Sequence, residues 1–134
     1  MATATLKFNI NNKALLGDTT QDCVTFYGTI AFSAAADVYL TGGIAPLTGF
    51  ALANLGPYGN RAPLEVRVYS QNGQGWKYIW NSATSKLMVF SGGASGANTT
   101  ADIELTNNTA LNATTPTIST DIVAFTAVFP RSMS

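Results

Sequence analysis

The stretch from Pro63 to Ser91 constrains the fold most, because apolar and polar residues alternate along it in three short runs. These runs are Leu64 to Ser70, Trp76 to Trp80 and Lys86 to Ser91. Successive side chains of a β-strand point to opposite faces, so alternation at period two is typical of half-buried strands. The turns between the runs are rich in Gly, Asn and Ser, which favours hairpins. The stretch therefore predicts a three-stranded antiparallel meander, with Leu64, Val66 and Val68 on one face of its first strand.

Other runs alternate in the same way and predict further strands. They are Leu6 to Ile10, Asp22 to Phe32, Val38 to Thr41, Asp102 to Thr106 and Asp121 to Phe129. The second of these contains Gly28, so it is either one long strand or two strands bent at a bulge. The last is apolar on both faces, which places it in the middle of a sheet or at a subunit contact. Residues 107–120 predict a polar excursion with at most one edge strand.

Helical signals are scarce. Only residues 46–55 combine a 3.6-residue spacing of apolar side chains with Pro at the start and Gly-Pro after the end, although Gly49 disfavours a helix there. The pattern predicts an all-β fold: an antiparallel β-sandwich, jelly-roll-like, with about eight short strands and at most one short helix. We expect a single β domain over residues 1–134, with residues 1–5 forming a flexible N-terminal arm.

Composition excludes several classes of partner. Charged residues make up 10% of the chain, and seven basic and seven acidic residues cancel, whereas a typical domain is about 25% charged. Nucleic-acid binding draws on clustered Lys and Arg, so no nucleic acid partner is predicted. No apolar run reaches the roughly 18 residues of a membrane span, and no signal-peptide pattern is seen, so we expect folding in a reducing cytoplasm and no membrane partner. Cys23 is the single cysteine and fits a small sheet residue.

The sequence offers little for catalysis. There is no histidine, which removes the commonest general base and most zinc sites. Asp102 and Glu104 share a strand face and suggest a calcium site, but solvated strand residues are the simpler interpretation. Glu65 and Glu104 are candidates for a glycosidase pair, yet nothing selects them. We therefore predict no enzyme, with no catalytic residue, no cofactor and no metal.

The stripe of Trp76, Tyr78 and Trp80 is the most specific local feature, because three aromatics recur at period two. It fits the core of a sandwich, which is the simplest interpretation. It also fits an interface, where Trp and Tyr are enriched. A third interpretation is a platform that stacks sugar rings or bases, although only Lys77 would accompany it.

Several short motifs resemble a group of small structural proteins of tailed phages. The motifs are a strand and turn at Val38 to Leu47, the step Ala53 to Gly56, the aromatic strand Gly75 to Trp80, the strand Lys86 to Phe90 and the final strand Val123 to Phe129. The resemblance spans about Phe26 to Arg131. It is to capsid decoration (cement) proteins, which bind as oligomers outside the major capsid shell. No residue-level binding site is implied by it.

The resemblance implies a bacteriophage virion structural protein located on the capsid surface. Its expected partners are the major capsid protein and further copies of itself, most simply in a homotrimer. Candidate interface residues are Met1, Thr5, Trp76, Tyr78, Trp80 and Arg131. A carbohydrate- or receptor-binding module of a phage fibre or tail, with Trp76 and Trp80 as its platform, is the alternative. A tail-tube or neck component is a third possibility.

Overall fold

The computed structural model of the chain describes residues 2–11, 23–52, 62–72, 76–91 and 102–130. Ten strands lie in these ranges: β1 (Thr5–Ile10), β2 (Cys23–Phe32), β3 (Val38–Tyr39), β4 (Ala45–Pro46), β5 (Glu65–Ser70), β6 (Lys77–Asn81), β7 (Lys86–Ser91), β8 (Ile103–Glu104), β9 (Thr109–Ala110) and β10 (Val123–Pro130). A short 3₁₀ turn, η1 (Ile118–Thr120), precedes β10. The prediction of an all-β fold is confirmed.

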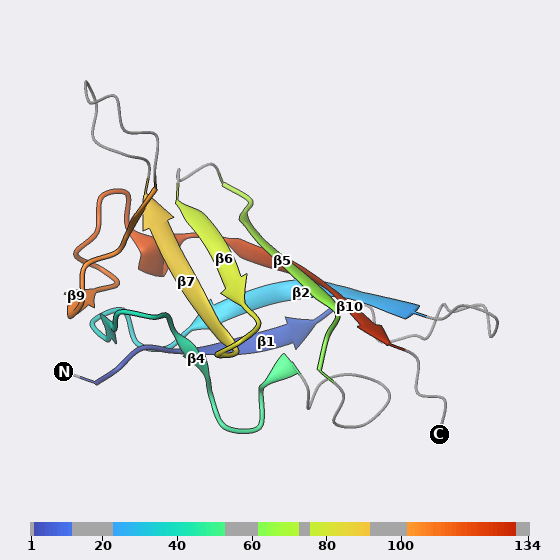
Figure 1. Cartoon of the computed structure of the whole chain (residues 1–134). Coiled ribbons are helices and arrows are strands. Elements are labelled where there is room, and N and C mark those ends of the chain that lie inside the picture. The colour runs from blue at the N-terminus through green and yellow to red at the C-terminus, as the bar shows by residue number, and fades with distance from the viewer. Residues whose placement is uncertain (1, 12–22, 53–61, 73–75, 92–101, 131–134) are drawn as a thin grey trace.

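The strands form two facing sheets and a small two-stranded element. The larger sheet has the order β4-β1-β2-β10-β5, the facing sheet has the order β6-β7-β8, and β3 pairs with β9. Figure 1 shows β6 and β7 lying in front of β1, β2 and β10. Neighbouring strands are antiparallel except β1 and β4, which run parallel over Thr5 and Leu6. This arrangement is a β-sandwich.

The core fills the space between the two sheets. Alternate residues of β1, β2 and β10 supply one side of it, as period-two alternation predicts. The ring of Phe8 from β1 meets Trp80 of β6 and Phe125 of β10, with centroids 5.5 and 5.0 Å apart, both edge to face. Such aromatic pairs add about 0.5–1.5 kcal/mol each beyond the burial of their area. Phe8 therefore joins both sheets at the centre of the molecule.

The final strand lies inside the larger sheet, with a neighbour on each edge, as its two apolar faces predict. β10 pairs with β2 from Val123 to Pro130 and with β5 from Val123 to Val128. Phe125 and Ala127 are completely buried. The strand begins two residues later than expected, so Ile122 precedes it and is 53% exposed.

The predicted three-stranded meander is wrong, although its three strands are present. β6 and β7 form the expected hairpin, but β5 pairs with β10 in the other sheet. The chain thus changes sheets between Ser70 and Lys77. Alternation identifies the buried face of a strand but not its hydrogen-bonding partner, and β10 needs a neighbour on each side. Val68 faces the core as expected, whereas Leu64 lies before β5 and is 62% exposed.

β2 is one continuous strand, not two strands bent at a bulge. Gly28 stays in register with Ile10 on one side and Phe125 on the other. A Cβ atom at this position would lie 1.8 Å from the backbone oxygen of Asn9. Gly28 is therefore needed because β1 approaches β2 closely at this point.

The predicted helix over residues 46–55 is wrong in its first part. Pro46 belongs to β4, where an edge strand tolerates the missing backbone donor. Gly49 adopts a positive φ of 88°, which interrupts helical geometry. Leu52 is helical and almost completely buried, while residues 53–55 lie outside the described ranges.

The expectation of a free N-terminal arm is corrected for residues 2–5. The N–H of Ala4 donates to the carbonyl of Val38, and the N–H of Val38 donates to the carbonyl of Ala2. Ala4 is 1% exposed, and Thr5 begins β1. Short side chains at these positions allow the backbone to pack closely against β3, so the segment belongs to the folded domain.

The excursion over residues 107–120 contains one short strand, β9, as predicted, but it also contributes to the core. Leu111 and Ile118 are completely buried. Thr114 fixes the turn between them, because its hydroxyl oxygen accepts the N–H of Ile118 at 2.8 Å. Because the segment is mostly polar, its sequence does not indicate that these two residues are buried.

We predict that Gly28→Ala destabilises the protein by about 1–3 kcal/mol or more, because the added methyl group meets fixed backbone. Urea unfolding followed by tryptophan fluorescence measures the change. Ala31→Ser, at an exposed position of the same strand, is the control and should change the stability by less than about 0.5 kcal/mol. Equal stability of the two variants would contradict the close approach of β1.

Candidate functional site

The aromatic stripe of β6 faces the interior of the sandwich. Tyr78 is 6% exposed and belongs to the core, and Trp76 and Trp80 are half-buried against it. The Tyr78 ring lies 6.4 Å from that of Phe32 in the facing sheet. Of the three interpretations open from the sequence, the core interpretation is confirmed for Tyr78. An interface role for Trp76 and Trp80 stays a prediction.

The Tyr78 hydroxyl is held by a buried carboxylate. It donates to Oδ2 of Asp121 at 2.5 Å, and the Ser70 hydroxyl donates to Oδ1 of the same group at 2.7 Å. Ser70 ends β5 and Asp121 precedes β10, so this network ties β6 to the larger sheet. Burial, and secondly the hydrogen bond to Asp121, raise the pKa of Tyr78 far above its ordinary value.

Trp76 is anchored at the rim of the same region. Its indole Nε1 donates to the carbonyl of Pro116 at 2.8 Å. The bond connects β6 to the excursion before η1. A sugar-stacking platform needs the ring faces open to solvent, and both tryptophans instead pack against the core. The structure therefore gives no support to a platform at Trp76 and Trp80.

A second buried tyrosine closes the other end of the sandwich. Tyr39 is completely buried, and its hydroxyl donates to Oε1 of Glu104 at 2.7 Å. The backbone N–H of Gly42 donates to the same oxygen at 2.7 Å, and the N–H of Val89 donates to the tyrosine oxygen at 3.3 Å. Burial, followed by the bond to Glu104, raises the pKa of Tyr39 far above its ordinary value, against a smaller lowering by Val89.

The two carboxylates considered for calcium have different partners. Lys77 Nζ donates to both carboxylate oxygens of Asp102, each at 3.0 Å. The carboxylate of Glu104 instead accepts the hydroxyl of Tyr39. Within the described ranges no group of three or more Asp, Glu, Cys or His side chains lies close enough to hold a metal ion. Glu104 thus forms a structural hydrogen bond, and the described residues do not provide the group of oxygen ligands that a calcium site needs.

The outer face of the β6–β7 hairpin carries apolar side chains that the sequence analysis did not select. Ile79 lies directly opposite Met88, and Lys77 lies opposite Phe90. Ile79 is 48% exposed, and Met88 and Phe90 are half-buried. We call Ile79, Met88 and Phe90 the hairpin face. The signal is present in the sequence, because these residues alternate along β6 and β7 with the buried ones.

Of the remaining candidate interface residues, the structure describes Thr5. Thr5 is half-buried in β1, where its N–H donates to Ser33 Oγ at 2.9 Å. Met1 and Arg131 lie outside the described residues. An interface role for these three residues stays a prediction.

Comparison of the chain with protein-family models, curated proteins and solved structures finds no match in any of the three. Separately, among the residues that the structure describes, no helix has the length and apolar character needed to cross a membrane.

We predict that the free energy of unfolding falls as the pH rises above about 10, the ordinary pKa of tyrosine. The folded state holds the protons of Tyr39 and Tyr78 more tightly than the unfolded state, so their contribution is complete below that pH and is lost above it. Urea unfolding at several pH values from 8 to 11, a range that brackets the ordinary pKa of tyrosine, measures the slope of the free energy of unfolding against pH. A Tyr39→Phe/Tyr78→Phe variant should show a smaller slope, and an unchanged slope would contradict the prediction.

We also predict that Tyr78→Phe costs about 1.5–3 kcal/mol, the usual value for a hydrogen bond to a charged group. In a double-mutant cycle with Asp121→Ala, the two losses should fail to add by about 1 kcal/mol or more, because the side chains are in contact. Tyr69→Phe, at a residue 46% exposed on the other sheet, is the control. Additive losses would show that the network does not couple the sheets.

Proposed function

We propose that this protein is a virion structural protein that decorates the outer surface of a capsid and stabilises the shell. The proposal is supported by the sequence motifs given above, the low charge of the chain and the apolar hairpin face. The hairpin face is the observation that carries it furthest, because apolar side chains that stay accessible on the outer side of a sheet, Ile79 exposed and Met88 and Phe90 half-buried, suit contact with another protein surface. The major capsid protein is the proposed partner.

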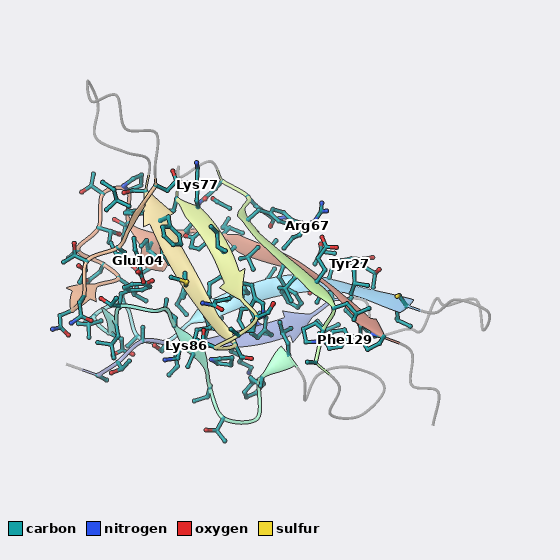
Figure 2. All side chains as sticks on the ribbon, in the orientation of Figure 1. Tyr27, Arg67, Lys77, Lys86, Glu104 and Phe129 are labelled. Atoms are coloured by element: carbon teal, nitrogen blue, oxygen red, sulfur yellow. The ribbon has the colours of Figure 1, made fainter. Side chains whose placement is uncertain are left out.

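The hairpin face suits such a contact in composition. Ile79 and Met88 provide its apolar centre, and Lys86 lies opposite Asn81 beside them. An apolar centre beside polar residues is the common anatomy of protein–protein contacts. Figure 2 shows Lys77 and Lys86 at opposite ends of the hairpin.

Sheet edges offer a second means of contact between copies. Border strands β4 and β8 span two residues each, but in the described part of the chain β5, with six residues, and β6, with five, also border their sheets. An unpaired strand edge of this length can continue a sheet into a neighbouring chain. The proposed homotrimer would therefore use both these edges and the apolar faces of the sandwich.

The experiment is to purify the virion, confirm that the protein is present in many copies, and titrate the protein onto heads from which it has been removed. Saturable binding that protects the heads against heat or dilution supports the proposal. Absence of the protein from the particle, or binding that does not saturate, would exclude decoration. Location in the tail or neck would favour the third possibility instead.

We predict that Ile79→Glu weakens binding to stripped heads by at least about tenfold, or about 1.4 kcal/mol, because a charge replaces the centre of the hairpin face. Tyr27→Ser, on β2 of the larger sheet, is the matched control and should bind as the unchanged protein does. Both side chains are about half exposed, so both variants should fold. Equal binding of the two variants would remove the hairpin face from the proposed contact.

A further inference from the structure

The outer face of the larger sheet carries a hollow that crosses β2, β10 and β5. Its volume is about 490 Å³, and it is open to solvent rather than enclosed. The lining residues are Thr25, Glu65, Arg67, Tyr69, Thr126 and Val128. Small-molecule sites commonly measure roughly 300–1,000 Å³. The hollow is therefore large enough for a ligand, and its open form suits one that extends across the strands.

Strand register sets the arrangement of these side chains. One row across the sheet contains Tyr27, Thr126 and Arg67, because β10 pairs Thr126 with both of the others. The next row towards the end of β10 contains Thr25, Val128 and Glu65. The central strand thus contributes the smaller side chains, and the longer ones stand on the flanking strands. This difference in length produces the hollow.

One tyrosine, Tyr69, lines the hollow, and a second, Tyr27, lies beside it in the same row as the lining residues Thr126 and Arg67. Tyr27 of β2 is 51% exposed and Tyr69 of β5 is 46% exposed. They lie two strands and two residues apart, which corresponds to roughly 12 Å from the usual spacings of a sheet. Exposed aromatic rings offer apolar faces and a hydroxyl that donates and accepts hydrogen bonds. Rings at this separation suit a ligand of more than one ring.

The polar groups of the hollow are neutral in sum. Arg67 Nε lies 2.5 Å from Glu65 Oε1, and both side chains remain at least half exposed. The guanidinium carries further N–H donors, and the carboxylate accepts from hydroxyl groups. The threonine hydroxyls add donors and acceptors. Figure 2 shows Tyr27 and Arg67 on the same side of the sheet, away from β6 and β7.

We propose that this hollow binds a neutral oligosaccharide. Charge complementarity selects the ligand, because a paired Arg and Glu favour an uncharged group rich in hydroxyls over a polyanion or a cation. Exposed tyrosine rings provide stacking surfaces for the apolar faces of sugar rings. The inference does not depend on the capsid proposal, since the hairpin face lies on the other sheet of the sandwich.

The experiment is calorimetric titration of the full chain with four neutral probes, which are maltohexaose, cellohexaose, laminarihexaose and the hexamer of N-acetylglucosamine, and with an anionic hexagalacturonate. Saturable binding of at least one neutral probe, tighter than that of the anionic probe, supports the proposal. No saturable binding of any neutral probe, or tighter binding of the anionic one, would overturn it.

Variants locate the site. Tyr27→Ala/Tyr69→Ala should weaken binding by at least tenfold, and Ile103→Ala, at an exposed residue of β8 in the other sheet, should leave it unchanged. Arg67→Met, at a side chain 77% exposed, is the second variant if the double variant fails to fold, and it should also weaken binding. Binding that survives both changes would overturn the assignment. So would sedimentation showing that the tyrosines instead join two copies of the chain.

Discussion

The structure depends on the interior position of β10 in the larger sheet. This strand is hydrogen-bonded along both edges, to β2 and to β5, and its inner face is apolar and buried. Phe125 and Ala127 have no exposed surface, and burying such side chains contributes the main favourable term in folding. A strand of this kind requires a neighbour on each edge and a second sheet over its inner face. The chain meets both requirements by changing sheets after Ser70: β5 pairs with β10, and β6 then belongs to the facing sheet.

Two tyrosine–carboxylate pairs fix how the parts of the sandwich sit together. Tyr78 of β6 with Asp121, just before β10, joins the two facing sheets, and Tyr39 of β3 with Glu104 of β8 joins the small β3–β9 element to the β6-β7-β8 sheet. Buried polar groups are costly unless satisfied, so such pairs favour one arrangement over neighbouring ones. Apolar contact supplies the attraction between these parts, and the hydrogen bonds favour one relative position.

The sequence predicted what a period of two can determine and little beyond it. It identified the strands and the buried face of Trp76, Tyr78 and Trp80 as the simplest interpretation, because alternation reports which side of a strand is apolar. It could not reveal that β5 pairs with β10 and not with β6, because strand pairing depends on competition among strands that are distant in the sequence. It treated Gly28 as a possible bulge, because a sequence does not show that the backbone of Asn9 approaches there. Neither outer face was predicted, since a surface is assembled from residues on several strands.

The two outer faces of the sandwich differ in chemistry: the hairpin face is apolar, and the face across β2, β10 and β5 combines tyrosines with a neutral ion pair. Copies attached to a capsid through the hairpin face, as proposed, would turn the hollow of the larger sheet to the surroundings. Binding to another surface would then depend more on the number of hollows than on the affinity of one hollow. Linked sites can exceed the affinity of one by a factor on the order of 10²–10⁴ when the geometry allows simultaneous engagement. A shallow, weakly binding hollow would in that setting give durable attachment to a glycan-covered surface.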